Sequence, residues 1–333
     1  MVGGPVFLTG ASGFVGGALL RRLVAGGREV RALARSDASA AELTAAGAEV
    51  VRGDLFDHGA LLSGMRGCTT VFHVAGLNSM CVRDAAPIMH TNVDGAAAVV
   101  RAAAAARVPK LVYTSSATTI GEPAGVIGRE ETLHRGSFMS NYERSKFLGE
   151  RRVLALGEEL ALPVVSVNPS SVQGPGRIGG SAALLLDIVN GRLPVLVNTW
   201  LSVVDVEDCS AAHVLAEREG VPGSRYLVSG ASFEVRTAVT LLRQASGHPR
   251  RVWFAPRVLA AVGGAVAGAA SRLTRRENGR ICPETVRTLL HGHRFDASLA
   301  ERELGLAYTP IETTIRRTLE WYAQKGMAPP PIG

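Results

Sequence analysis

Thr9-Gly10-Ala11-Ser12-Gly13-Phe14-Val15-Gly16 decides the fold, because it follows a short apolar run, Val6-Phe7-Leu8, and opens an amphipathic one. This order predicts a strand, a tight glycine turn and a helix. Glycines at this spacing let the backbone turn sharply, let a diphosphate approach bare N–H groups and let the helix pack against the strand. The spacing differs from the usual Gly-x-Gly-x-x-Gly fingerprint. A dinucleotide site therefore needs support from the rest of the chain, and an ordinary loop is the alternative.

The end of the next predicted strand, residues 29–34, bears on the kind of dinucleotide. Sites for the unphosphorylated cofactor place an acidic residue there, which accepts hydrogen bonds from the ribose. Here Arg35 and Ser36 follow Ala34. A guanidinium suits a 2′-phosphate, and the serine can add a hydrogen bond. We expect NADP(H) to be preferred over NAD(H), with an ordinary exposed arginine as the alternative.

Two further strands are predicted over residues 48–52 and 70–76. The first ends in Gly53-Asp54-Leu55, where the Asp54 carboxylate could accept a hydrogen bond from an adenine amino group. The second ends in small residues that let its backbone approach a cofactor. His73 lies inside that strand, so we expect it to be a packed side chain and not a catalytic one.

A fifth strand, residues 110–114, ends in Ser115-Ser116, whose hydroxyls would face the ligand crevice of a doubly wound sheet. After a long loop, Tyr142 and Lys146 open a helix. Their spacing puts them on one helical face, where the ammonium can favour the tyrosinate and bind a ribose. Following a glycine turn and a strand-terminal serine, this pair predicts a general acid and base.

Charge and cysteine content narrow the function classes. The 333 residues carry a net charge of +7, but the arginines are scattered without a basic run, so we expect no nucleic-acid partner. The four cysteines, at positions 68, 81, 209 and 282, show neither metal-ligand nor redox spacing. We expect reduced thiols, no metal site and a cytoplasmic location.

Membrane association is not expected from the sequence. The chain starts without a charged region before its first strand, so no signal peptide is predicted. The apolar stretch from Val258 to Ala270 is shorter than the about 20 residues that span a bilayer. We expect a buried helix or a flap over an apolar substrate, and its flanking arginines leave peripheral attachment as an alternative.

In their order, these motifs resemble the extended short-chain dehydrogenase/reductase superfamily, and the resemblance covers nearly the whole chain. The matching positions are Thr9 to Gly16, Gly53-Asp54-Leu55, His73-Val74-Ala75-Gly76, Asn92-Val93, Thr114-Ser115-Ser116, Tyr142 to Lys146 and Asn168-Pro169-Ser170. The resemblance implies an α/β fold, a Rossmann-type doubly wound parallel sheet with a smaller C-terminal substrate lobe. Residues 1–175 would mainly form the NAD(P)-binding domain and residues 176–333 the substrate lobe, with 195–230 returning to the Rossmann sheet.

The resemblance also implies roles for individual residues. Ser116 would hold the substrate oxygen, Tyr142 would transfer the proton, and Lys146 would bind the nicotinamide ribose and lower the tyrosine pKa. Asn92 would support the active-site helix. The expected cofactor-binding positions are Gly10, Ser12, Gly13, Phe14, Val15, Arg35, Ser36, Asp54, Leu55, Val74, Ala75, Gly76, Thr114, Tyr142, Lys146, Pro169, Ser171 and Val172. The expected substrate positions are Leu77, Ala117, Gln173 and Leu184.

Where the sequence departs from the family pattern, it disfavours particular branches of the family. Nucleotide-sugar 4,6-dehydratases carry an acidic pair after the catalytic hydroxyl, where this chain has Ala117. Nucleotide-sugar epimerases commonly carry an arginine before the Val203–Asp208 segment, where this chain has residues 198–202. That weakens an NDP-sugar substrate, although Arg177, Arg192 or Arg236 could serve instead.

The remaining branches differ in chemistry. Arg35 and the Tyr142–Lys146 segment are similar to the dihydroflavonol-reductase, cinnamoyl-CoA-reductase and 3β-hydroxysteroid-dehydrogenase branches. The segments 142–150 and 167–175 are also similar to hopanoid-associated sugar epimerases. We therefore expect an NADP(H)-dependent ketone or aldehyde reductase, or secondary-alcohol dehydrogenase, with a fairly apolar small-molecule substrate. The alternatives are a sugar or NDP-sugar epimerase or dehydratase that retains NAD(P), and a non-catalytic cofactor-sensing protein. The family suggests a homodimer.

Overall fold

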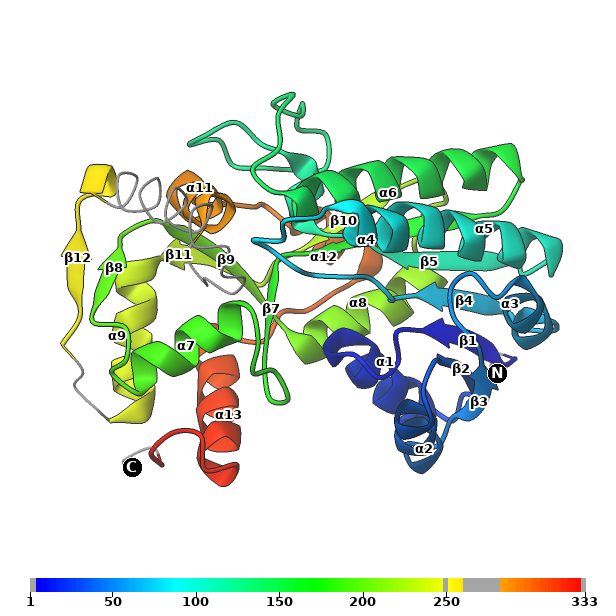
Figure 1. The fold of residues 1–333 in the computed structure, drawn as a ribbon, viewed down its shortest axis with the longest axis horizontal. Coiled ribbons are helices and arrows are strands. Elements are labelled where there is room, and N and C mark those ends of the chain that lie inside the picture. Colours follow the sequence, from blue (N-terminus) through cyan, green and yellow to red (C-terminus); the bar gives the residue numbers. More distant parts are fainter. Residues whose placement is uncertain (1–3, 248–250, 260–281, 331–333) are drawn as a thin grey trace.

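The main architectural feature is a seven-stranded parallel sheet with the strand order β10-β6-β5-β4-β1-β2-β3 (Figure 1). It is seen in a computed structural model that describes residues 4–247, 251–259 and 282–330. The strands are β1 (Val6–Thr9), β2 (Val30–Ala34), β3 (Glu49–Arg52), β4 (Thr70–His73), β5 (Lys110–Thr114), β6 (Val164–Pro169) and β10 (Arg225–Val228). The order reverses beside β1, which places the glycine turn at the ligand-binding edge of the sheet.

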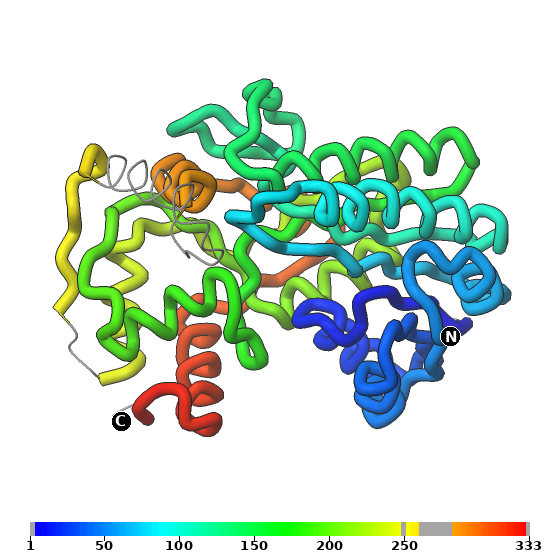
Figure 2. Tube along the Cα trace, in the orientation of Figure 1, coloured from blue at the N-terminus to red at the C-terminus, as the bar shows by residue number. Residues whose placement is uncertain are grey.

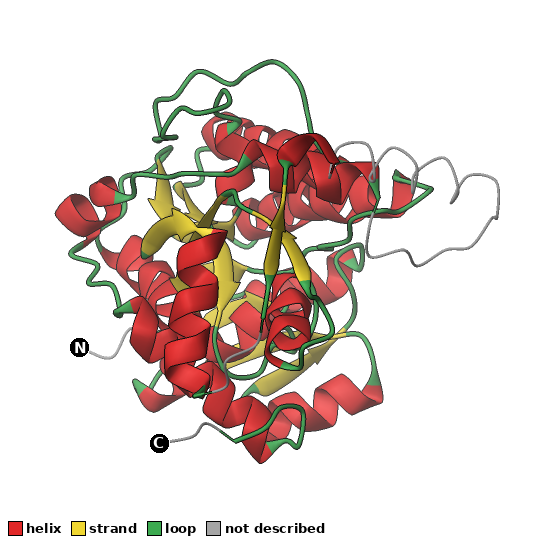
Figure 3. Cartoon of the chain, turned by 90° about the vertical axis from the view of Figure 1, so that its left-hand side faces the viewer, coloured by secondary structure: helices red, strands yellow, loops and turns green. Residues whose placement is uncertain are grey.

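Helices cover both faces of this sheet, so the predicted doubly wound fold is confirmed (Figure 3). One face packs against α1 (Phe14–Ala25), α8 (Val206–Arg218) and α12 (Ser298–Leu304), and the other against α3 (His58–Met65), α5 (Ala96–Ala105) and α6 (Asn141–Glu159). The helix α2 (Asp37–Ala45) lies beside β2 and β3. Because both faces are covered, central strands such as β1 are buried at every residue and read as continuous apolar runs.

Most of the remaining described elements build a smaller lobe, at the left of Figures 1 and 2. It holds a three-stranded sheet of β7 (Ser171–Gln173), β9 (Trp200–Asp205) and β11 (Ala231–Glu234), and a pair of β8 (Val195–Val197) and β12 (Trp253–Ala255). Its helices are α7 (Ser181–Val189), α9 (Val235–Ser246), α11 (Pro283–His291) and α13 (Ile311–Gln324). Apolar side chains of α7, α9 and α13 form a core of their own around Leu242 and Leu319.

The expectation for residues 195–230 needs a correction. Only α8 and β10 return to the Rossmann sheet, because β8 pairs with β12 while β9 pairs with β7 and β11. Of the apolar stretch expected from Val258 to Ala270, residues 260–270 lie outside the described part of the chain. Among the residues that are described, no helix is long and apolar enough to cross a membrane.

The expectation of four reduced thiols is wrong for two of them. Cys81, in the loop after β4, forms a disulfide with Cys282, directly before α11, and their Cα atoms lie 5.7 Å apart. Cys68 and Cys209 are free and buried. The partners are separated by 201 residues in sequence, so local spacing carried no sign of the pair. Since disulfides persist in oxidising surroundings, cysteine usage no longer supports a cytoplasmic location.

Candidate active site

The glycine turn between β1 and α1 forms a close-packed cradle. Gly10 has φ +75°, and a Cβ added there would come within 2.6 Å of the Ala75 backbone nitrogen at the end of β4. A Cβ on Gly16 would collide with the carbonyl oxygen of Gly10. The turn therefore needs glycine at both positions, and α1 begins directly behind it with no acidic residue in its first turn. These features fit the diphosphate of a dinucleotide, which bare N–H groups and a helix N-terminus bind well.

Arg35 and Ser36 lie where β2 passes into α2, beside this cradle. Arg35 is exposed and makes no hydrogen bond or ion pair within the described residues. Ser36 caps α2 by accepting a hydrogen bond from the Ser39 amide at 3.2 Å. An exposed guanidinium next to a helix N-terminus is suited to a phosphate. Asp54, at the end of β3, accepts from the amides of Phe56 and Asp57 and so shapes its own turn.

His73, the last residue of β4, is buried as predicted. Its Nδ1 lies 2.7 Å from the Thr9 hydroxyl, which in turn accepts a hydrogen bond from the Ala75 amide. Burial, reinforced by the positive charge of Lys146, lowers the pKa of His73 to about 3. The imidazole is therefore neutral at physiological pH and ties the ends of β1 and β4 together.

Ser116 and Tyr142 come together at the end of β5. Ser116 caps the short helix η2 (Ala117–Ile120), and its Oγ accepts a hydrogen bond from the Thr118 hydroxyl at 3.0 Å. Tyr142 lies in the first turn of α6, which Ser140 caps. Burial raises the pKa of Tyr142, while a hydrogen bond with Ser116 and the charge of Arg177 oppose the increase. The phenol is thus protonated at neutral pH and available as a proton donor.

Lys146 lies one helical turn after Tyr142 and is 5% exposed. Its ammonium donates to the Thr114 carbonyl at 2.7 Å and to the Tyr113 hydroxyl at 3.3 Å. Burial lowers its pKa to about 8, and the Glu150 carboxylate acts in the opposite direction. The ammonium is therefore fixed at the carboxyl end of β5, beside the Cα of Gly76, where an added Cβ would lie 3.8 Å from Nζ.

Asn92 joins the loop after β4 to the active-site helix. It lies in a π-helical turn, η1 (His90–Gly95), that follows α4 (Ala86–Met89). Its amide group accepts from the Leu77 N–H at 2.8 Å and donates both to the Leu77 carbonyl and to the Ser145 hydroxyl, each at 2.9 Å. Ser145 stands between Tyr142 and Lys146 in sequence, so this bridge fixes the part of α6 that carries both.

Arg177 is a site residue that the sequence indicated only as one of three arginines for a diphosphate. Its guanidinium lies 5.6 Å from the centre of the Phe14 ring at the start of α1, and its charge acts on the Tyr142 phenol. It also donates to the Gly179 carbonyl at 3.2 Å. The Gly174–Gly180 segment after β7 thus places the Arg177 guanidinium between the glycine turn and Tyr142.

The other predicted positions lie at the ends of strands and on the elements that follow them. Pro169 ends β6, whereas Ser171, Val172 and Gln173 form β7, where the Gln173 amide donates to the Ser171 and Ser181 hydroxyls. Ala117 is buried within η2. Leu77 and Leu184 are 37% and 48% exposed. The remaining cofactor positions, Ser12, Gly13, Val15, Leu55, Val74 and Thr114, lie in the glycine turn, at the start of α1 and at the ends of β3, β4 and β5.

This fold and glycine turn define an oxidoreductase of the extended short-chain dehydrogenase/reductase class. A model of the NAD-dependent epimerase/dehydratase family matches residues 6–229, and the chain belongs to that family.

Relatives match along almost the whole chain. Sterol demethylase protein B of Methylococcus capsulatus is 30% identical over 96% of this chain and 98% of its own. The 2-alkyl-3-oxoalkanoate reductase of Shewanella oneidensis is 32% identical over 93% of this chain and 84% of its own. The crystal structure of gox2253 is similar with a TM-score of 0.84 and 30% identity, covering 97% of this chain and 99% of that one.

Proposed function

We propose that the protein is an NADP(H)-dependent reductase of ketones or aldehydes, or the corresponding secondary-alcohol dehydrogenase. The observation that carries the proposal is the convergence of Ser116, Tyr142 and Lys146 at the carboxyl end of β5, next to a cradle that fits a diphosphate. The 2-alkyl-3-oxoalkanoate reductase relative, named for carbonyl reduction, supports it.

When bound, the nicotinamide supplies hydride to a carbonyl carbon or accepts it from an alcohol carbon. In the direction of reduction, the Tyr142 hydroxyl donates its proton to the carbonyl oxygen, which acquires negative charge as the new C–H bond forms at the carbonyl carbon. The Ser116 hydroxyl donates a hydrogen bond to the same oxygen and orients it. The backbone on both sides belongs to regular structure, because Ser116 caps η2 and Tyr142 lies in the first turn of α6.

Lys146 contributes through its charge and its position. The ammonium lies on the same face of α6 as Tyr142 and stabilises the phenolate that proton donation leaves behind. It keeps one donor available for a ribose hydroxyl, because an ammonium has three N–H groups and two are used by Thr114 and Tyr113. Both functions require the charged form, which with a pKa of about 8 is present at neutral pH.

The preference for NADP(H) rests on the end of β2. Arg35 has no anionic partner among the described residues, and Ser36 stands at the N-terminus of α2. A 2′-phosphate there would gain charge-assisted hydrogen bonds and a favourable helix dipole. An unphosphorylated ribose would offer no anionic group to the Arg35 guanidinium or to the N-terminus of α2.

An apolar substrate is supported by exposed aliphatic side chains on segments that follow strands of the two lobes. Leu77 follows β4, Ile178 follows β7 and Leu184 lies on α7, with exposed fractions of 37%, 54% and 48%. Exposed aliphatic residues on segments that border a cleft favour apolar ligands. We therefore propose a ketone with a sizeable hydrocarbon part, and Arg177 beside Tyr142 is suited to an anionic group on the same molecule.

An epimerase that retains its cofactor is the second candidate, and the description of the matching family favours it. Such an enzyme returns the hydride to its substrate, so it consumes no NADPH overall. Arg177 would then hold the diphosphate of a nucleotide sugar.

The test is turnover with NADPH against a panel of aliphatic and aromatic ketones, 3-oxo acids and NDP-sugars. We expect NADPH oxidation with a ketone or 3-oxo acid, and a loss of about a hundredfold or more in kcat for Tyr142→Phe with cofactor affinity retained. Tyr308→Phe is the matched control, because it removes a phenol hydroxyl that accepts from the Ser229 amide directly after β10. Epimerisation of an NDP-sugar without NADPH oxidation, or full activity of Tyr142→Phe, would refute the proposal.

A further inference from the structure

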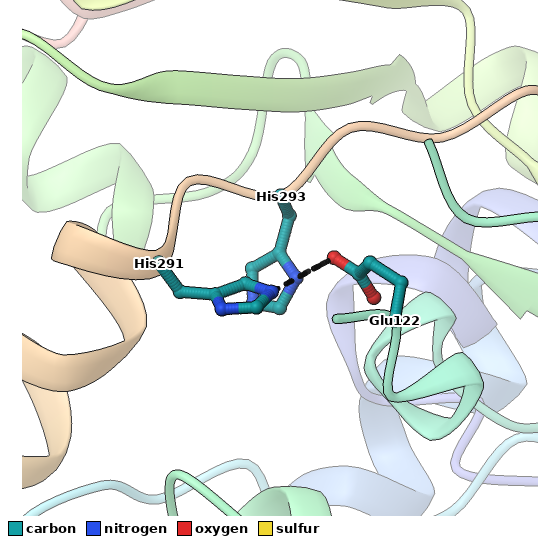
Figure 4. A group of neighbouring side chains, drawn as sticks. All are labelled: Glu122, His291 and His293. Atoms are coloured by element: carbon teal, nitrogen blue, oxygen red, sulfur yellow. Dashed lines mark hydrogen bonds and ion pairs between the residues drawn. The ribbon is translucent and has the colours of Figure 1, made fainter. Parts of the chain in front are cut away.

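Three side chains with metal-binding atoms face one another between the two lobes (Figure 4). Glu122 follows η2, His291 ends α11, and His293 lies two residues further on. The Glu122 Oε1 atom lies 3.3 Å from His291 Nε2 and 2.7 Å from His293 Nδ1. One ligand atom from each of the three lies within 4.8 Å of the others.

The cluster is buried and its polar atoms are incompletely paired. The side chain of Glu122 is 1% exposed, and those of His291 and His293 are 9% and 13% exposed. Within the described part of the chain, Glu122 Oε2 and His293 Nε2 are buried without a hydrogen-bond partner. Two imidazoles crowd one carboxylate oxygen while the other accepts nothing. Leaving a buried carboxylate oxygen unpaired is costly in free energy, so the arrangement points to a further, positively charged partner.

The backbone is shaped to bring the two histidines to the same carboxylate. Gly292 between them has φ +73°, and an added Cβ would collide with the Thr199 hydroxyl and lie 3.0 Å from the Trp200 amide nitrogen. This glycine ends α11 and reverses the chain, so that residues on either side of it face Glu122. The His291 and His293 ring centres lie 4.9 Å apart.

A nearby cation, the guanidinium of Arg135, is paired elsewhere and does not form an ion pair with the Glu122 carboxylate. Arg135 donates to the backbone carbonyl of Glu122 at 3.4 Å, but its guanidinium pairs with Glu143. Burial on its own would raise the pKa of Glu122, and the hydrogen bonds from His291 and His293 outweigh it and bring the pKa to about 2.

We propose that Glu122, His291 and His293 bind one divalent transition-metal ion, with Zn²⁺ as the occupant. Two imidazole nitrogens and a carboxylate oxygen are a common zinc set, and water completes the tetrahedron. Zinc bonds of about 2.0–2.1 Å set neighbouring ligand atoms roughly 3.3 Å apart in a tetrahedron. The Glu122–His291 distance already has this value, and the His293 ring needs to withdraw by about half an ångström.

The metal would connect the segment that begins at Ser116 with the segment that follows α11. No local spacing predicted this site, because His293 is 171 residues from Glu122. The proposal does not depend on the reaction that the protein catalyses, and its test uses metal binding and thermal stability.

The experiment is a titration of chelator-treated, full-length protein with Co²⁺, without reductant, followed by displacement with Zn²⁺. We expect one equivalent of Co²⁺ per chain, with visible d–d bands of a four-coordinate nitrogen and oxygen site and no thiolate charge-transfer band. Zn²⁺ should remove these bands and raise the Tm. His293→Asn and Glu122→Gln should each lose the bands and the Tm increase.

His90→Asn is the matched control, because His90 forms an exposed pair with Asp94 and, among the described residues, belongs to no such cluster. It should bind Co²⁺ like the wild type. Circular dichroism of each metal-free variant shows that it is folded, and His291→Asn replaces any variant that is not. The proposal is overturned if the wild type takes up no stoichiometric Co²⁺, or if the bands persist in folded His293→Asn or Glu122→Gln.

Discussion

Replacing Lys146 by methionine should change how the stability of the protein depends on pH. The ammonium is 5% exposed, and burial lowers its pKa from 10.5 to about 8. Below pH 8 the folded and the unfolded chain both hold the proton, so the folded chain bears the full cost of burying the charge. Between pH 8 and 10.5 the folded chain has released the proton while the unfolded chain retains it. The free energy of unfolding of the wild type therefore rises with pH in this window.

The size of the effect follows from the pKa values. A difference between 10.5 and about 8 corresponds to about 3 kcal/mol, at roughly 1.4 kcal/mol for each unit. Lys146→Met carries no titrating group at this position. Its lost hydrogen bonds to Thr114 and Tyr113 add an offset that does not depend on pH. Relative to the variant, the wild type should thus gain about 3 kcal/mol between pH 7 and pH 11.

The assay is urea unfolding of both proteins at several pH values across this range, followed by tryptophan fluorescence. Lys325→Met, which removes an exposed ammonium at the end of α13, is measured beside them as a control for general charge effects. A constant difference between wild type and Lys146→Met would refute the burial argument. A difference that changes in the opposite direction would show that attraction to Glu150 outweighs burial.

Three other predictions concern separate parts of the molecule. Arg35→Ala should raise the KM for NADPH by about 10–100-fold, as expected for lost charge-assisted hydrogen bonds, while changing the KM for NADH little; equal effects on both cofactors would contradict the 2′-phosphate assignment. Asn92→Ala breaks three hydrogen bonds of a buried amide group and should lower the free energy of unfolding by about 3 kcal/mol; urea unfolding checks this, and a loss below about 1 kcal/mol would contradict it. Replacing Cys81 and Cys282 by serine should cost about 5 kcal/mol, because the bond closes a loop of 201 residues. A reductant should destabilise the wild type equally and leave the double variant unchanged, and an insensitive wild type would mean that the thiols are unpaired in solution.

The fold could be predicted because its signals are local. The apolar strand Val6–Thr9, the glycine turn and the apolar face of α1 lie within 20 residues of one another, and each has a physical reason that needs no tertiary context. The strand Lys110–Thr114 was predicted with its observed bounds. The small sheets were not predicted, since β9 pairs with β7 and β11 through contacts that depend on how the lobes pack.

The candidate site was predictable to the same extent. Tyr142 and Lys146 share one helix, so their spacing shows that they lie on one face. The surroundings of each side chain could not be predicted in this way. The Thr114 carbonyl that holds Lys146 and the Arg177 charge that acts on Tyr142 both come from other elements. The resemblance implied that Lys146 lowers the tyrosine pKa, which stays a prediction, and Ser116 and Arg177 are two further groups that lower it against the effect of burial.

The helix α11, orange in Figure 1, explains why the second lobe matters to the catalytic face of the first. Its Glu284 carboxylate accepts from the amides of Cys81 and Asn141, the residue before Tyr142, at 2.9 and 3.0 Å. Its Arg287 donates to the Met139 carbonyl just ahead of α6.

The disulfide lies at the start of this helix and the proposed metal cluster at its end. A side chain that accepts from the backbone at the start of α6 fixes the position of the turn that carries Tyr142, because the first turn of a helix has free N–H groups. A change in how α11 docks would therefore move Tyr142, the proposed proton donor, as well as the smaller lobe. For this reason we expect Glu284→Gln, which keeps the side-chain shape and weakens both hydrogen bonds, to lower kcat. Expressed as a free energy, this loss should exceed the decrease in the free energy of unfolding.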